Sequence, residues 1–99
     1  QVAFARLGLS LVKAAVVSAH GKDHAAAVRE TAEAIGRGRI VFLIADPEFS
    51  VQALAAALPG ETGLAVCEDL GYPEERIARG TAAEPPIPVS GLFVVVVGC

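Results

Sequence analysis

The sequence predicts an α/β fold, an αβα sandwich built on a mixed five-stranded sheet. Short apolar runs alternate along the chain with segments of helical periodicity, which is typical of this class. The runs also lack the alternation of half-exposed strands, which indicates strands covered on both faces. The 99 residues, of which 54% are hydrophobic, are enough for one domain with a single core.

The first predicted elements are a strand over residues 14–18 and a helix over residues 24–35, which Asp23 caps. The helix face expected to meet the sheet carries four apolar residues: Ala25, Val28, Ala32 and Ile35. Before the strand, residues 2–7 have the spacing of an amphipathic helix. Because the chain also contains no Met, we expect it to be a fragment that begins inside a helix.

A second strand and helix, followed by three strands, complete the pattern. Residues 40–45 predict a buried strand, and residues 49–58 predict a helix that stops at Pro59-Gly60. Further strands are predicted over residues 64–67, 76–81 and 92–97. Three prolines within residues 85–88 predict an extended connection before the last strand.

Composition excludes several classes of protein. A net charge of −3 argues against a nucleic-acid partner or an anionic lipid surface. The last apolar run, residues 92–97, covers about a third of the ~20 residues that a membrane helix needs. Cys67 and Cys99 form neither a disulfide framework nor a metal cluster, and we interpret Cys67 as a small buried hydrophobe. With no signal peptide visible, we expect a cytoplasmic protein.

The segment over residues 66–81, V-C-E-D-L-G-Y-P-E-E-R-I-A-R-G-T, concentrates special residues behind an apolar strand. Gly71 allows backbone to approach a ligand closely, and Pro73 makes a rigid corner. This pattern predicts a site at the end of the strand. An acidic pair and two arginines that can neutralise it also lie here: Glu68, Asp69, Arg76 and Arg79.

Other polar residues allow more than one interpretation. His20 is either a histidine at the end of a strand or a residue of a substrate cleft, whereas we interpret His24 as a surface residue at a helix start. Asp46, before Pro47, is typical of a turn and helix cap. In a receiver-like signalling domain, the alternative class, Asp46 would accept a phosphoryl group. That class needs an acidic cluster after the first strand and a late Lys, which the sequence lacks. A purely structural interaction domain is a third possibility.

Taken in order, five stretches of the chain resemble the tetrapyrrole (corrin/porphyrin) methylases. They are V-V-S-A-H-G (16–21), L-I-A-D (43–46), E-D-L-G-Y-P-E-E-R-I (68–77), R-G-T (79–81) and V-V-V-V (94–97). The pattern is most similar to the precorrin-6Y methyltransferases of cobalamin biosynthesis. The order and spacing agree over almost the whole chain.

The resemblance implies that the chain is the C-terminal domain of a two-domain enzyme. Such an enzyme transfers methyl groups from S-adenosylmethionine (SAM) to a precorrin and holds SAM in the cleft between its domains. The N-terminal domain would be absent from this chain, so the chain alone should be inactive. The family also implies a homodimer of the full-length protein.

The resemblance further implies which residues form the site. Expected cofactor contacts are Leu43, Ile44, Ala45, Asp69, Leu70, Gly71 and Leu92, and expected substrate contacts are His20 and Gly21. We expect no catalytic side chain and no metal, because methyl transfer from a sulfonium depends on proximity and alignment. The chain departs from the subgroup at three positions, with Ala45 in place of Thr, Asp69 in place of Asn and Phe93 in place of Asn.

Overall fold

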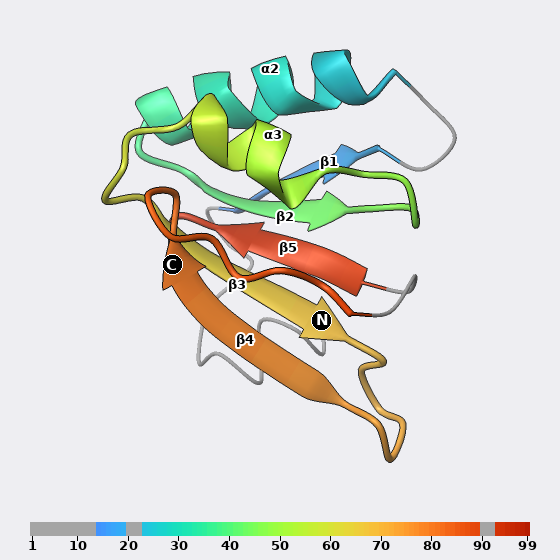
Figure 1. Cartoon of the computed structure of the whole chain (residues 1–99). Coiled ribbons are helices and arrows are strands. Elements are labelled where there is room, and N and C mark those ends of the chain that lie inside the picture. Colours follow the sequence, from blue (N-terminus) through green and yellow to red (C-terminus); the bar gives the residue numbers. More distant parts are fainter. Residues whose placement is uncertain (1–13, 20–22, 90–92) are drawn as a thin grey trace.

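A computed structural model describes residues 14–19, 23–89 and 93–99 of the chain. These residues form a single sheet with two helices on one of its faces (Figure 1). In chain order the elements are β1 (Ala14–Ser18), α2 (His24–Gly36), β2 (Ile40–Ile44), α3 (Val51–Ala56), β3 (Gly63–Glu68), β4 (Arg76–Thr81) and β5 (Phe93–Val97). The helix expected over residues 2–7 and the expected contacts His20, Gly21 and Leu92 lie outside the described residues.

The sheet is mixed, with the strand order β1-β2-β5-β3-β4. β1 and β2 are parallel, whereas β5 is antiparallel to both β2 and β3, between which it lies. β4 pairs antiparallel with β3 at the edge. The carboxyl ends of β1, β2 and β3 therefore lie at the same edge of the sheet as the amino ends of β4 and β5. The α/β class and the mixed five-stranded sheet are confirmed.

The apolar runs of β2 and β5 form strands that are buried on both faces, whereas Val16 of β1, which was also predicted to be a buried strand, is 63% exposed. Val41, Phe42 and Leu43 are consecutive and all buried, and the same holds for Val95, Val96 and Val97. In each run alternate residues belong to two different clusters, one of which packs against the helices. Because both faces of these strands are covered, their sequences show no alternation of apolar and polar residues, as expected.

Helix α2 has the predicted inner face in part, because Val28 and Ile35 pack against the core cluster. Asp23 caps it as expected, accepting hydrogen bonds from the amides of Ala25 (2.9 Å) and Ala26 (3.4 Å). The buried stripe, however, is Ala27, Thr31 and Ala34, and the predicted core residue Ala25 is exposed. Small residues let the helix approach the sheet closely. Thr31 is tolerated there because its hydroxyl donates to the carbonyl oxygen of Ala27 (2.8 Å).

Helix α3 is shorter than predicted at both ends. Ser50 caps it through a hydrogen bond from the amide of Ala53 (3.0 Å). Before the cap, the amide of Phe49 donates to the carbonyl of Asp46 and forms a turn (3.1 Å). At the far end, Leu58 donates back to Ala55 with the tighter spacing of a 3₁₀ turn (3.1 Å). Neither described helix is long and apolar enough to cross a membrane.

At Gly63 and Gly80 the backbone of another segment comes very close to a strand. A Cβ added at Gly63 would overlap the carbonyl oxygen of Cys99, and the amide of Gly98 donates to the carbonyl of Gly63 (2.8 Å). A Cβ at Gly80 would lie 2.6 Å from the carbonyl oxygen of Glu84. The proline-rich segment that Glu84 begins is extended, as predicted, and returns the chain from β4 to β5.

Candidate functional site

A pocket of about 340 Å³ lies at the edge of the sheet where β2 and β3 end and β5 begins. The insertion of β5 between the two parallel strands creates this arrangement, because its amino end meets their carboxyl ends. Open α/β sheets bind ligands at this kind of edge. The lining residues are Ile44, Ala45, Cys67, Asp69, Leu70, Tyr72, Phe93 and Val94.

The walls of the pocket are mostly apolar. Among the lining residues, Asp69 contributes a carboxyl group and Tyr72 a phenol hydroxyl. Ile44 is 37% exposed and Tyr72 is 64% exposed, so large apolar surfaces remain accessible here. Apolar walls with a few polar groups suit a ligand that has a flat apolar part and a few hydrogen-bonding groups.

The turn between β3 and β4 shapes one wall of the pocket. Asp69 has a φ of 50° and Gly71 a φ of 84°, both in the left-handed region. Gly, Asn and Asp are the residues that adopt this conformation most readily. The amide of Tyr72 donates to the carbonyl of Asp69 (3.0 Å), and the amide of Gly71 donates to Oε1 of Glu75 (3.0 Å). The backbone conformation therefore explains why either Asp or Asn suits position 69.

Glu68 precedes this turn and is almost fully buried, with 1% of its side chain exposed. Oε1 accepts a hydrogen bond from the guanidinium of Arg76 (2.6 Å), and Oε2 accepts one from the amide of Val89 (2.9 Å). The carboxylate thus connects the end of β3, the start of β4 and the proline-rich segment. The predicted ion pair is confirmed for Glu68 and Arg76.

Cys67 contributes a buried thiol to the pocket lining, with 1% of the residue exposed. Burial, together with a smaller contribution from the nearby Cys99, raises the pKa of this thiol to about 11. Because the nucleophilic form of cysteine is the thiolate, Cys67 is unreactive at neutral pH. The interpretation of Cys67 as a buried hydrophobe is confirmed.

The structure brings four of the seven expected cofactor residues into the pocket wall: Ile44, Ala45, Asp69 and Leu70. Leu43 has no exposed surface and packs in the core on the helix side, because alternate residues of β2 point to opposite faces. Gly71 lies in the adjoining turn, exposed and outside the lining set. Within the described residues, no group of three or more His, Cys, Asp or Glu side chains could hold a metal ion.

Tyr72, Phe93 and Val94 line the pocket but were not expected cofactor residues. The side chain of Tyr72 is largely exposed at the pocket. Phe93 and Val94 enter the wall through the antiparallel pairing of β5, in which Val94 faces both Ile44 and Cys67. Strand order does not follow from hydrophobic patterning, so patterning alone could not place these two residues at the pocket.

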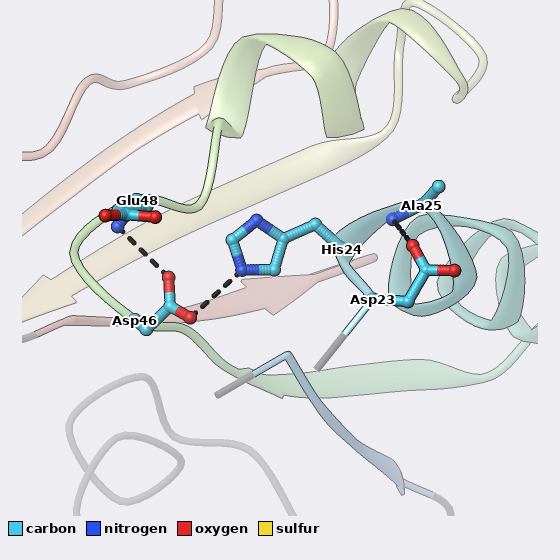
Figure 2. Close-up of polar contacts among 5 residues, drawn as sticks. All are labelled: Asp23, His24, Ala25, Asp46 and Glu48. Carbon is cyan, nitrogen blue, oxygen red and sulfur yellow. Dashed lines mark hydrogen bonds and ion pairs between the residues drawn. The ribbon is translucent and has the colours of Figure 1, made fainter. Parts of the chain in front are cut away.

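A hydrogen-bonded pair, His24 and Asp46, lies at the same edge of the sheet, where the chain leaves β2 (Figure 2). Nε2 of His24 lies 3.0 Å from Oδ2 of Asp46, and Oδ1 of Asp46 accepts a hydrogen bond from the amide of Glu48 (3.0 Å). The imidazole also contacts the ring of Phe49 edge-on, with centroids 5.4 Å apart. The turn role of Asp46 is confirmed. The interpretation of His24 as a mere surface residue is wrong, because it is a partner of Asp46 and Phe49.

The fold defines an α/β domain that carries an apolar pocket at the sheet edge where its parallel strands end. Residues 1–86 match the sequence model of the Tetrapyrrole (Corrin/Porphyrin) Methylases. The chain belongs to this family, which confirms the resemblance and excludes the receiver-like alternative. A comparison with curated proteins finds no match.

Two solved structures are similar to the chain over 98% of its length. The precorrin-6Y methylase CbiE from Archaeoglobus fulgidus is 26% identical, with a TM-score of 0.69. The methyltransferase CobJ is 14% identical with a TM-score of 0.75, a likeness that shows the fold alone. The chain spans 43% of the first structure and 46% of the second, less than half the length of either.

Proposed function

We propose that this chain is the C-terminal domain of a SAM-dependent methyltransferase that methylates a precorrin ring in cobalamin biosynthesis. The observation that carries the proposal is the apolar pocket at the carboxyl ends of β2 and β3. Four residues that the family resemblance implies as cofactor contacts meet there from two separate strands. Family membership supports methyl transfer, and the 26% identity to a precorrin-6Y methylase supports that substrate type.

The pocket lining fits the chemistry of SAM. Ile44, Leu70 and Tyr72 offer apolar and aromatic surface on which an adenine ring can rest. The carboxylate of Asp69 provides an acceptor for a ribose hydroxyl or an ammonium group. SAM supplies the methyl group on a sulfonium, and the role of this chain is to hold and orient the cofactor. Orientation of this kind is a large part of catalysis in a displacement reaction.

The opposite wall of the cleft belongs in this proposal to an N-terminal domain. The precorrin would lie between the two domains, with His20 and Gly21 among its contacts, and Leu92 would add to the cofactor wall. The full-length protein would act as a homodimer in the cytoplasm. Each of these features comes from the family resemblance, and the two similar solved structures are more than twice as long as this chain.

The test is to measure binding of S-adenosylhomocysteine by calorimetry to a protein that joins this chain to its N-terminal domain. Ile44→Glu places a charge in the apolar wall at a partly exposed position, so we expect affinity to fall more than about tenfold. Val16→Glu is the matched control, because Val16 lies on β1, is 63% exposed and is not part of the pocket lining. It should leave affinity unchanged.

Two outcomes would contradict the proposal. If the folded wild-type protein bound no S-adenosylhomocysteine, the assigned cofactor would be wrong. If the Ile44 and Val16 variants lost affinity equally, the cofactor would not occupy this pocket.

A further inference from the structure

We infer that His24 and Asp46 form a brace that positions the end of β2 against the cofactor, so that both act as positioning residues. The inference rests on the proposed function, because it assigns a role in building the same pocket. Neither residue lines the pocket itself. The brace acts through Ala45, which lines the pocket and directly precedes Asp46.

Both carboxylate oxygens of Asp46 are held by separate parts of the chain (Figure 2). Oδ2 is 3.0 Å from Nε2 of His24, and Oδ1 is 3.0 Å from the amide nitrogen of Glu48. Two fixed oxygens on a planar carboxylate fix the rotamer of the side chain. A fixed rotamer in turn restricts the backbone at Asp46, and hence the orientation of the residue before it.

His24 is itself anchored at a stable point of the fold. It is the first residue of α2, whose N-terminus Asp23 caps, and α2 packs over β1 and β2. Its imidazole contacts Phe49, which is 5% exposed and belongs to the core, with an interplanar angle of 69°. The brace therefore transmits the position of a helix to the turn after β2.

The brace lies where the main-chain hydrogen bonds of β2 stop. The main-chain ladder between β1 and β2 reaches its end with the hydrogen bond from the amide of Ala19 to the carbonyl of Ile44 (2.8 Å). The chain then leaves the sheet at Ala45, where it lines the pocket. A charge-assisted hydrogen bond one residue further on limits the motion of this wall. The side chain of Asp46 is only 15% exposed, so water competes weakly for it.

Two substitutions of His24 separate the hydrogen bond from the ring contact. His24→Phe keeps an aromatic ring beside Phe49 but removes the donor to Asp46. His24→Gln removes the ring but keeps an N–H donor at a similar distance from the backbone. A structural residue that only fills space would be replaced better by Phe, whereas a brace would be replaced better by Gln.

The experiment uses the full-length protein and two measurements on each variant. One is the affinity for S-adenosylhomocysteine, and the other is the rate of amide hydrogen exchange of Glu48, which donates to Asp46. We expect His24→Phe to weaken binding about tenfold and to accelerate exchange, and His24→Gln to remain within about twofold of wild type in both. Asp46→Asn, which retains an acceptor without the charge, should fall between them and serves if His24→Phe does not fold.

Several outcomes would overturn the brace. Unchanged exchange and affinity in His24→Phe would show that the hydrogen bond positions nothing. Equal losses in both His24 variants, in proportion to lost thermal stability, would show that His24 only supports the fold. Faster exchange with unchanged affinity would show that the restraint does not reach the pocket.

If the wild-type protein binds no S-adenosylhomocysteine, the proposed function fails, and hydrogen exchange alone then decides whether the brace exists. In that case faster exchange in His24→Phe that His24→Gln restores supports the brace, and any other result overturns it.

Discussion

Replacing Glu68 with Gln tests whether the buried carboxylate beside the pocket stabilises the fold. The substitution keeps the size of the side chain and removes its charge. In the native chain, Glu68 accepts hydrogen bonds from the guanidinium of Arg76 at 2.6 Å and from the amide of Val89 at 2.9 Å. With 1% of its side chain exposed, Glu68 has almost no access to water that could replace either bond.

The expected loss follows from these two bonds. Gln offers one acceptor oxygen in place of two, so its NH2 group must face either the Arg76 guanidinium or the Val89 amide, and one of the two hydrogen bonds is lost. A buried donor left without an acceptor costs about 1–3 kcal/mol. The hydrogen bond from Arg76 contributes less to stability than the one from Val89, because 45% of the Arg76 side chain is exposed and water can solvate the guanidinium. We therefore expect Glu68→Gln to lower the free energy of unfolding by about 1.5–2 kcal/mol. For a domain of this size, the melting temperature falls by roughly 8–12 °C.

The assay is urea unfolding followed by circular dichroism, with Arg76→Gln and the double variant completing a cycle. We expect Arg76→Gln alone to cost at most about 1 kcal/mol, and the cycle gives the coupling energy between Glu68 and Arg76. Glu61→Gln, at an exposed position, is the matched control and should change stability by less than about 0.5 kcal/mol. A loss of the same small size for Glu68→Gln would refute the reasoning.

Further predictions concern backbone geometry and the buried thiol. Gly63→Ala places a methyl group on the carbonyl of Cys99, where backbone must move, and should cost about 3 kcal/mol or more in urea unfolding. Gly36→Ala meets no atom within 4 Å at the end of α2 and should leave stability equal or raise it by about 0.5 kcal/mol. At Asp69, where φ is 50°, Asn should be neutral and Val should cost about 2 kcal/mol in the same assay. Burial raises the pKa of Cys67 from 9.0 to about 11, so between these values the unfolded chain loses the thiol proton and the folded chain keeps it. The native chain should therefore lose roughly 2 kcal/mol more stability from pH 8 to pH 11 than Cys67→Ala, as measured by denaturant titration at each pH. Equal losses in the two proteins would contradict this.

The hydrophobic pattern predicted the elements of the fold because each depends on residues close together in the sequence. The strands over residues 14–18 and 76–81 were predicted with the bounds that the structure has. Helix α3 was predicted too long, because Asp46 and Ser50 use the first residues of the pattern for a turn and a cap. A periodic pattern marks where a helix packs but not which hydrogen bonds end it.

Contacts between distant residues could not be predicted in this way. The pairing of His24 with Asp46 spans 22 positions, and the two residues separately resemble an ordinary helix start and an ordinary turn. The inner face of α2 was predicted in part, because Val28 and Ile35 pack against the core whereas the buried positions are Ala27, Thr31 and Ala34. Phe93 and Val94 of the pocket wall could not be predicted for the same reason, because their position there depends on the strand order.

The ends of β2 and β3, which both contribute to the pocket wall, are held in similar ways. At the end of β2, Ala45 lines the pocket and is followed by Asp46, which His24 holds from α2. At the end of β3, Cys67 lines the pocket and is followed by Glu68, which contacts β4 and the proline-rich segment.

In both cases an acidic side chain next to a wall residue fixes that wall to a neighbouring element. Because these restraints need no ligand, the wall is already ordered before a ligand binds. A ligand that binds this wall therefore causes a smaller loss of conformational entropy than it would at a flexible site.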